Sequence, residues 1–507
     1  MNINVLEWID HSAERFSEKT AFSDEKNAVS FRRFADTAKS IGCAIANILN
    51  GARKMPVVVM IGRDASSLEM LLGVVYSGNF YVPIDTTIPQ MRIELMINTL
   101  QAPLIISSRA NRDLLERLGF EGSILYYEDI ADGPVDTALL ADIRRNTIDT
   151  DPLYCLFTSG STGTPKGVLV THRSVIDLIE QFSDTFGFSE KNIFGNQAPF
   201  DFDVSVKDIY STLRNGATMH IIPKTFFSFP IKLIEHINEN SINTVIWATS
   251  AMRIVANFKA LDKTLPLSIQ TVMFSGEVMP NKVLNYWRRH LPGARYVNLY
   301  GPTEITCNCT YYIVDREFDD ADPLPIGIPF RNTDILLLSG NEPASPGETG
   351  EICVRGTSLA LGYYNNPQKT AAAFVQNPLN STYPELIYRT GDLGRYNDRA
   401  ELLFLSRKDS QIKHMGHRIE LGEIESAANA LDFVGAACCL YDEPNQRIVM
   451  CYQAAEQRDR QIVLALMKVL PKYMVPNRLI WYRQLPMSKN AKIDRVKLRQ
   501  EYDNGAI

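Results

Sequence analysis

The sequence lacks the features that mark nucleic-acid-binding and membrane proteins. Its net charge is −6, and no block of like charges stands out that could bind phosphates. No run of about 18 apolar residues is present, so no membrane-spanning helix is expected. The first ten residues include acidic side chains and do not have the layout of a signal peptide. We therefore expect a cytoplasmic protein that neither binds nucleic acid nor inserts into a membrane.

The sequence also lacks a recognisable metal-binding spacing. Its eight cysteines are scattered, Cys307-x-Cys309 is too close for the usual zinc pair, and no histidine cluster accompanies it. Buried free thiols in a reducing compartment are the better interpretation. No internal repeat is present, and a chain of 507 residues is too long for one hydrophobic core. Two or more domains are expected.

Short β-rich runs alternate with longer amphipathic stretches over most of the chain. This alternation predicts an α/β fold with largely parallel sheets, in which ligands gather at the loops beyond the strand ends. The runs that indicate strands are residues 57–60, 104–107, 244–247, 270–274 and 295–299, and those that indicate helices are residues 66–76 and 109–118.

The pattern changes to a compact α+β segment after about Glu401. Residues 406–410 are charged and poor in apolar side chains, so they are the best candidate linker. We expect a large N-terminal domain of layered sheets and helices over 1–408 and a small mobile domain over 409–507, with Asp409 at the boundary.

A glycine-rich segment, residues 156–168, follows an apolar run that reads as a buried strand. Glycines let backbone N–H groups approach an anion, hydroxyl groups donate further hydrogen bonds, and Lys166 supplies positive charge. The segment does not have the spacing of the P-loop of nucleotide hydrolases, because Pro165 precedes the lysine and Gly167 follows it. It predicts a polyphosphate-binding loop, with a flexible surface turn as the alternative.

The segment Thr-Ser-Gly-Ser-Thr-Gly-Thr-Pro-Lys-Gly closely resembles the phosphate-loop signature of adenylate-forming enzymes. This superfamily includes acyl-CoA synthetases, luciferases and peptide-synthetase adenylation domains. Further motifs that resemble those of the superfamily follow in its order at residues 202–205, 298–304, 350–351, 362–363, 388–393, 406–413, 470–476 and 490–494.

The resemblance implies ATP and Mg²⁺ as cofactors and assigns roles to individual residues. Attack of a carboxylate on the α-phosphate brings two anions together, and Lys492 would offset their repulsion. Glu304 would hold Mg²⁺ and Thr303 would contact phosphate, while Asp409 would be the hinge about which the small domain rotates. The residues expected to bind ATP are Thr158, Ser159, Gly160, Ser161, Thr162, Gly163, Lys166, Gly276, Glu277, Val278, Asn298, Leu299, Tyr300, Gly301, Asp392, Arg407 and Lys492.

Within that set, the resemblance implies that the Tyr300 ring stacks on adenine. The alternative is that Tyr300 is an aromatic residue of the hydrophobic core. Asp392 would accept the ribose hydroxyls with Arg407 beside it, and the alternative for Asp392 is a turn-capping residue.

Asp203 indicates the substrate, since amino-acid-activating members of the superfamily pair an Asp here with the α-ammonium. By motif alignment the substrate pocket comprises Asp203, Val204, Lys207, Ala248, Met273, Ser275, Leu299, Cys307 and Asn308. Most of these side chains are mid-sized and apolar, which suits a small amino acid such as alanine. An inward Lys207 would suit an acidic or hydroxylated substrate, whereas an outward Lys207 would be a solvated helix residue; we favour the outward orientation.

The resemblance is nearest to freestanding amino-acid adenylation enzymes such as D-alanine–carrier-protein ligases. It implies formation of an aminoacyl-adenylate with release of pyrophosphate, followed by transfer to a phosphopantetheine thiol. No carrier domain follows Lys492 in this sequence, so the thiol is expected on a separate carrier protein. An acyl- or aryl-CoA synthetase and a degenerate, non-enzymatic scaffold are the alternatives.

Overall fold

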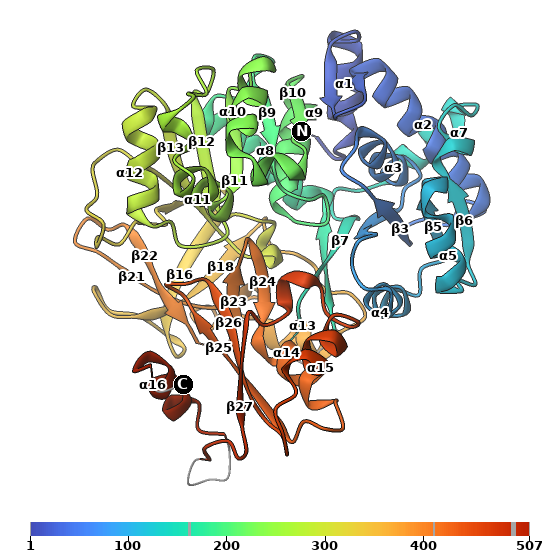
Figure 1. The fold of residues 1–507 in the computed structure, drawn as a ribbon. Helices are drawn as coiled ribbons and strands as arrows, with labels where there is room; N and C mark the ends of the chain where they lie inside the picture. Colours follow the sequence, from blue (N-terminus) through green and yellow to red (C-terminus); the bar gives the residue numbers. More distant parts are fainter. Residues whose placement is uncertain (1, 161–163, 409–410, 488–492, 506–507) are drawn as a thin grey trace. The chain divides into compact units, whose positions relative to one another are not determined.

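The computed structural model describes residues 2–160, 164–408, 411–487 and 493–505 (Figure 1). The chain divides into two compact units, which are described separately below. Unit 1 comprises Met1–Thr86, Leu100–Leu156 and Gly167–Lys408. Unit 2 comprises Thr87–Thr99, Phe157–Lys166 and Asp409–Ile507.

The largest sheet among the described residues has nine strands and is parallel through its centre. In spatial order its strands are β15 (Ile328–Pro329), β14 (Thr310–Ile313), β13 (Arg295–Tyr300), β12 (Thr271–Ser275), β11 (Thr244–Ala248), β9 (Ile193–Asn196), β10 (Thr218–Ile221), β1 (Thr20–Ser23) and β2 (Ala28–Ser30). Antiparallel pairs close both edges, β13 with β14 and β1 with β2.

A second sheet contains the strand that leads into the glycine-rich segment. Its order in the described chain is β19 (Gly362–Tyr363), β8 (Lys166–Thr171), β7 (Pro152–Thr158), β4 (Phe80–Asp85), β3 (Pro56–Ile61), β5 (Leu104–Ser107) and β6 (Ser123–Tyr126). Every residue of β3 is buried, as expected for an apolar strand covered on both faces of a parallel sheet.

The third sheet of unit 1 is antiparallel. It consists of β17 (Glu342–Pro343), β16 (Thr333–Ser339), β18 (Gly350–Gly356), β21 (Leu386–Tyr396) and β20 (Phe374–Gln376), with β22 (Leu402–Arg407) paired to β21.

Helices join and cover the parallel strands of unit 1; Figure 1 shows α11 beside β11 and β12. They are α1 (Leu6–Arg15), α2 (Phe31–Ile48), α3 (Ala65–Tyr76), η1 (Arg109–Asn111), α5 (Arg112–Leu118), α6 (Tyr127–Ile130), α7 (Thr137–Arg145), α8 (His172–Phe186), α9 (Val204–Asn215), η2 (Lys224–Ser228), α10 (Pro230–Glu239), α11 (Thr249–Asn257), η3 (Ala260–Asp262), α12 (Asn281–His290), η4 (Thr303–Ile305) and α13 (Pro367–Ala373).

Local sequence signals fix the ends of the helices near the candidate site. The hydroxyl of Thr171 accepts the N–H of Ser174 and so caps the start of α8, and Gly187 ends it with a φ of 70°. Gly216 ends α9 in the same left-handed conformation. The apolar faces of these helices join one large cluster of buried side chains within unit 1.

Unit 2 has an α+β composition. Its strands are β23 (Gln411–His414), β24 (His417–Glu420), β25 (Ala436–Asp442), β26 (Arg447–Gln453) and β27 (Arg478–Tyr482). Its helices are α4 (Gln90–Leu100, of which all but the last residue lie in unit 2), α14 (Leu421–Asn429), α15 (Asp459–Leu466), η5 (Lys472–Met474) and α16 (Arg495–Asp503). Cys439, Met450 and Tyr452 lie in its main core, which is separate from the cores of unit 1.

The predicted α/β fold with a small C-terminal α+β region is confirmed, and each of the strands and helices expected from the sequence is present within one or two residues. The predicted linker is wrong in part. Ser406 and Arg407 belong to β22, and the Lys408 ammonium group bonds to Glu351, so these three residues are held in unit 1. The charges of Arg407 and Lys408 gave the segment its linker-like composition, but these two side chains form ion pairs with Asp392 and Glu351. Asp409 and Ser410 lie outside the described residues.

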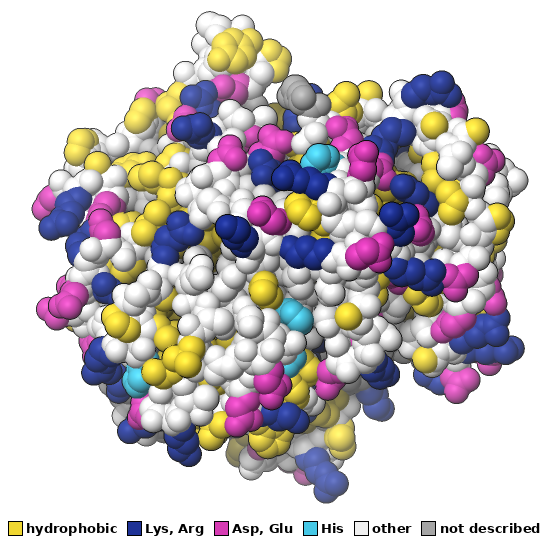
Figure 2. Space-filling model, turned by 90° about the horizontal axis from the view of Figure 1, so that it is seen from above, with side chains coloured by type: hydrophobic (Ala, Val, Ile, Leu, Met, Phe, Trp, Pro, Cys, Tyr) yellow, Lys and Arg dark blue, Asp and Glu magenta, His cyan; other side chains and the backbone are white. Residues whose placement is uncertain are grey.

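The surface agrees with the mixed charge of the sequence. Figure 2 shows acidic and basic side chains interspersed over one face. All eight cysteines are free and buried, as predicted. Within the described part of the chain, no helix is long and apolar enough to cross a membrane.

Candidate active site

The carboxyl ends of β11, β12 and β13 bring several of the predicted residues to one edge of the nine-stranded sheet. Ala248 and Ser275 are direct partners in the β11–β12 register, and Phe274 pairs with Asn298 on β13. Met273 and Leu299 are buried in the same strands. Neighbouring parallel strands end together, so residues far apart in the sequence share this edge.

The turn after β12 depends on glycine. Gly276 has a φ of 95°, which favours a residue without a Cβ. The carboxylate of Glu277 lies 3.4 Å from the Arg253 guanidinium, and Val278 is exposed. Of the three predicted residues here, Glu277 is therefore held by an ion pair and Val278 faces outward.

The turn after β13 is tightly packed. A Cβ on Gly301 would come within 2.7 Å of the Asn308 Cα and of the Cys307 carbonyl oxygen. Thr306 and Cys307, directly after η4, have φ values of 59° and 76°. Consecutive left-handed residues other than glycine are uncommon and cluster at functional sites. The Thr306 hydroxyl donates to the Ser358 carbonyl at 2.7 Å and helps to hold this conformation.

Two predicted nucleotide-binding residues contact the carboxylate of a third. The hydroxyl of Tyr300 donates to Asp392 Oδ2 at 2.6 Å, and the Arg407 guanidinium forms an ion pair with Asp392 Oδ1. Asp392 and Arg407 face each other across β21 and β22. The alternative of a turn-capping Asp392 is wrong, because the residue lies inside a strand. Burial raises the pKa of Tyr300, and the neighbouring carboxylate raises it further.

Asn298 and Thr303 lie on either side of Tyr300 in the sequence. The amide of Asn298 donates to the Pro325 carbonyl at 2.8 Å, and Thr303 begins η4 with a nearly buried side chain.

Glu304 is the candidate metal ligand. Its side chain is completely buried, and Oε1 accepts the hydroxyl of Tyr363 at 2.8 Å. The described residues contain no group of three or more His, Cys, Asp or Glu that could hold a metal ion. Mg²⁺ that is bound mainly by phosphate oxygens needs only one or two protein carboxylates, so a single Glu304 fits this kind of site.

The predicted substrate pocket lies at the start of α9. Asp203 immediately precedes this helix and is partly exposed, and Val204 is its first residue. The favoured outward orientation of Lys207 is wrong: its side chain is 0% exposed, and Nζ donates to Asn308 Oδ1 at 2.6 Å. The physical reason is that every residue of α9 from 205 to 213 is buried, so this stretch has no solvent-facing side.

The Cys307 thiol lies close enough to Lys207 and Asp203 for both to influence its pKa. Burial raises the pKa of its thiol to about 12, Lys207 counteracts the shift, and Asp203 adds to it. Asp203 and Cys307 also raise the pKa of Tyr154, after burial as the main cause. The Tyr154 hydroxyl is buried and has no hydrogen-bond partner among the described residues. The residues predicted to form the substrate pocket therefore combine acidic, basic and neutral polar groups in a largely buried setting.

In unit 2, the glycine-rich segment is in contact with polar groups of residues 418–423. The Ser159 hydroxyl donates to the Arg418 carbonyl at 2.8 Å and accepts the N–H of Glu420. The N–H of Gly160 donates to a carboxylate oxygen of Glu423 at 3.2 Å. A backbone N–H of the predicted phosphate loop thus already contacts an anion.

Glu423 is itself buried and paired with Arg92, and burial raises the pKa of Glu423 against the effect of that arginine. The Thr158 hydroxyl is buried without a hydrogen-bond partner in the part of the chain that the structure describes. Lys166 begins β8. Ser161, Thr162, Gly163, Asp409 and Lys492 lie outside the described residues.

Comparison with known proteins decides the family. A model of the AMP-binding enzyme family matches residues 9–364. The chain belongs to this family. The superfamily predicted from the motifs is therefore confirmed.

Full-length similarity extends beyond the matched region. The chain is 28% identical to tyrocidine synthase 1 of Brevibacillus parabrevis, over 98% of this chain and 45% of that protein. It is 29% identical to the D-alanine–D-alanyl carrier protein ligase of Bacillus velezensis, over 98% of this chain and 99% of that protein. The chain thus spans less than half of the synthase and nearly all of the ligase.

The fold is shared with a solved adenylation domain, AlmE of Vibrio cholerae, in complex with glycyl-adenosine-5′-phosphate. The TM-score is 0.84 at 21% identity, over 99% of this chain and 98% of that chain.

The sequence did not reveal four side chains that complete these groups. Tyr363 contacts Glu304, Tyr154 lies near Asp203, and Glu423 with Arg92 contacts the glycine-rich segment. Tyr363 lies in a motif that was recognised but given no role. Tyr154, Arg92 and Glu423 lie in runs without any motif signal, and only the fold of each unit brings each of them beside its neighbours there.

Proposed function

We propose that this chain activates a small amino acid with ATP as an aminoacyl-adenylate, releases pyrophosphate, and transfers the aminoacyl group to the phosphopantetheine thiol of a separate carrier protein. The observation that supports an amino acid most directly is the acidic–basic pocket at the start of α9, where Asp203 and Lys207 both lie near Cys307. A carboxylate in a largely buried pocket needs a cationic partner, and an α-ammonium group supplies one. Membership of the AMP-binding family supports the nucleotide part of the reaction.

The contacts around Asp392 support its role as the ribose ligand. Its carboxylate is buried, and Arg407 and Tyr300 fix its orientation. A carboxylate with two oxygens accepts hydrogen bonds from two vicinal hydroxyls. We assign Gly276, Glu277, Val278, Asn298, Leu299, Tyr300 and Gly301 to the adenine side of the site, and Thr158, Ser159, Gly160, Ser161, Thr162, Gly163, Lys166 and Thr303 to the phosphates.

Glu304 would hold Mg²⁺, which would neutralise phosphate charge when bound. Glu304 and Thr303 belong to the one-turn helix η4, so their positions are coupled. The Tyr363 hydroxyl donates to Glu304 Oε1 and so orients this carboxylate.

The two half-reactions are assigned to two positions of a lobe formed by residues 409–507, hinged at Asp409. In the first, Lys492 would bridge the amino-acid carboxylate and the α-phosphate and offset their repulsion. In the second position, the phosphopantetheine thiol of the carrier protein would take the place of Lys492. The relatives support a carrier protein as the source of the thiol, since the Bacillus velezensis relative of nearly equal length is named for a carrier-protein substrate.

ATP–pyrophosphate exchange tests the proposal. Purified protein is assayed with each of the twenty amino acids, D-alanine, benzoate and medium-chain fatty acids. We expect exchange only with one or a few amino acids. Exchange with benzoate or fatty acids and with no amino acid would contradict the proposal and favour an acyl- or aryl-CoA synthetase.

The second half-reaction is tested by mass spectrometry of the products. We expect the aminoacyl thioester on a phosphopantetheinylated carrier protein. Formation of the CoA thioester at an equal or higher rate, with no loading of any carrier protein, would contradict this part of the proposal.

A further inference from the structure

Lys207 is an unusual lysine for a pocket that was expected to be mainly apolar. Among the described residues it is the one lysine with a completely buried side chain. Its Nζ donates to the neutral amide oxygen of Asn308, which also accepts the Cys307 thiol at 3.5 Å. No salt bridge pairs Lys207 with a carboxylate in the described part of the chain. A buried ammonium group is costly unless an anion compensates it.

Asp208 is the alternative internal counter-charge, and its contacts argue against that role. Its Oδ2 accepts the amide of Asn196 at 2.8 Å, and Arg63 acts on it together with Lys207. Burial raises the pKa of Asp208 to about 7, so the carboxyl is held only weakly in its charged form near neutral pH. Asp208 therefore does not serve as the anionic partner of the Lys207 ammonium group.

The Tyr154 hydroxyl is a second, independent sign that the pocket receives a polar ligand. Tyr154 is completely buried, lies near Asp203 and Cys307, and has no hydrogen-bond partner among the described residues. A buried hydroxyl without a partner is unfavourable, and a ligand with an acceptor oxygen relieves this cost. An alanine side chain offers no such oxygen.

We propose that the substrate is an amino acid with a side-chain carboxylate, bound with its α-ammonium group at Asp203 and its side-chain carboxylate at Lys207. This inference rests on the proposed function and adds the substrate class. Asp203 and Lys207 are one helical turn apart at the start of α9, and both influence the pKa of the Cys307 thiol. The two charges of opposite sign match the two charged ends of a dicarboxylic amino acid. Lys207 would then determine the specificity for the substrate side chain.

The test compares acidic amino acids with their uncharged isosteres in amino-acid-dependent ATP–pyrophosphate exchange. The panel is aspartate, glutamate, asparagine, glutamine, serine and alanine, each as the L and D isomer. We expect kcat/KM for aspartate or glutamate to exceed that for the matching amide by about 100-fold, because the amide leaves the ammonium group uncompensated. If alanine or an amide is activated as well as the acids, the inference is overturned while the proposed function stands. If no amino acid supports exchange, the proposed function itself fails.

The variant Lys207→Met removes the charge and shortens the unbranched side chain by one heavy atom. We expect it to reduce kcat/KM for the acidic substrate by about 100-fold and to leave the matching amide unchanged or better. Lys282→Met on the exposed face of α12 is the matched control and keeps the wild-type preference. An unchanged preference in Lys207→Met would overturn the inference. If that variant does not fold, as judged by its thermal melt, the wild-type panel alone decides.

Discussion

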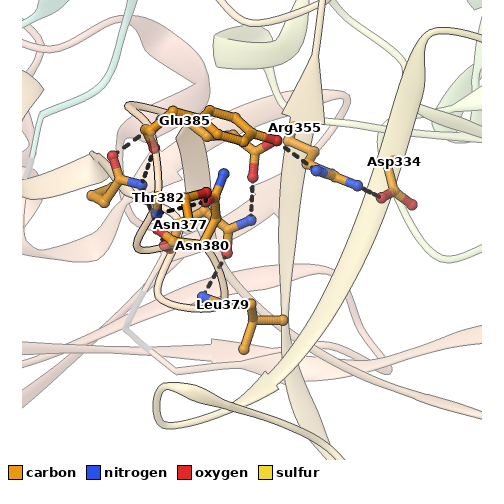
Figure 3. Close-up of polar contacts among 9 residues, drawn as sticks. Asp334, Arg355, Asn377, Leu379, Asn380, Thr382 and Glu385 are labelled. Atoms are coloured by element: carbon orange, nitrogen blue, oxygen red, sulfur yellow. Dashed lines mark hydrogen bonds and ion pairs between the residues drawn. The ribbon is translucent and has the colours of Figure 1, made fainter.

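At the scale of single residues, the site is organised by buried charges whose partners lie on other strands. The clearest example is the Asp392–Arg407 pair, whose side chains are 3% and 11% exposed. Its Cα partners face each other across an antiparallel pair of strands. The same sheet holds a second pair with the same cross-strand register, Asp334 and Arg355, but these side chains are 49% and 37% exposed. Figure 3 shows Arg355 between Asp334 and Glu385 at the surface of this sheet.

The two pairs give a matched prediction. Asp392→Asn should lower kcat/KM for ATP by about 10- to 100-fold, since it weakens charge-assisted hydrogen bonds in a buried setting. Asp334→Asn should change kcat/KM for ATP less than about two-fold, because an exposed ion pair contributes little. Exchange kinetics at varied ATP concentration measure both values. Equal effects of the two substitutions would contradict the assignment of Asp392 to the nucleotide.

Motif order was enough to predict Asp392, Arg407, Glu304 and Asp203 as candidates, because each stands in a recognisable local pattern. The orientation of Lys207 was not predictable in this way. A lysine on a helix is normally expected to face solvent, but nearly all of α9 is buried. The Tyr300–Asp392 contact was also missed, since the two residues are 92 positions apart and meet only through the fold.

At the scale of elements, periodicity predicted the buried strands well, because their apolar runs are covered on both faces. The linker prediction is wrong for Ser406 and Arg407, which end β22, because Arg407 and Lys408 give this part of the chain the composition of a linker. Helix α8 also depends on a contact that sequence could not reveal. Its first residue, His172, is buried, and Nδ1 accepts the N–H of Val5 at 3.4 Å, so α8 is joined to the start of α1.

This contact predicts a pH dependence of stability. Burial lowers the pKa of His172 to about 3. Below its ordinary pKa of about 6.5, the unfolded chain binds a proton at this histidine that the folded chain does not bind. The folded state therefore loses stability as the pH falls from about 6.5 toward 3. At pH 5.0 we expect a loss of about 2 kcal/mol relative to pH 7.5 from this residue.

Chemical unfolding at pH 7.5 and pH 5.0 measures this loss as the difference between wild type and His172→Asn, which removes the titrating ring. The control is His11→Asn, since His11 is exposed and its replacement should leave the pH dependence unchanged. Parallel pH profiles of wild type and His172→Asn would contradict the prediction.

At the scale of the whole molecule, the account assigns the two half-reactions to one chain with two compact units. Residues 157–166 of the glycine-rich segment belong to the same compact unit as residues 409–507, and the Gly160 N–H donates to the Glu423 carboxylate. Sequence could predict that this segment binds an anion, but not that a carboxylate of the C-terminal segment contacts it, because such contacts depend on three-dimensional packing.

The proposed division of labour predicts that the half-reactions can be separated. Lys492→Ala should lower adenylate formation by at least about 100-fold, because it removes the charge that offsets two anions, and should leave thioester formation from supplied adenylate within about two-fold of wild type. Single-turnover assays of each half-reaction measure the two effects. Lys497→Ala, at an exposed position of α16, is the control and should alter neither step. Equal loss of both steps in Lys492→Ala would contradict the two-position account.

The central claim is that this chain joins an α-amino acid to AMP. The most direct measurement is mass spectrometry of the acyl-adenylate formed when the protein, ATP and Mg²⁺ are mixed with equal concentrations of amino acids, benzoate and a medium-chain fatty acid. The account predicts an aminoacyl-adenylate as the main product. A benzoyl- or fatty-acyl-adenylate, or no adenylate at all, would contradict it.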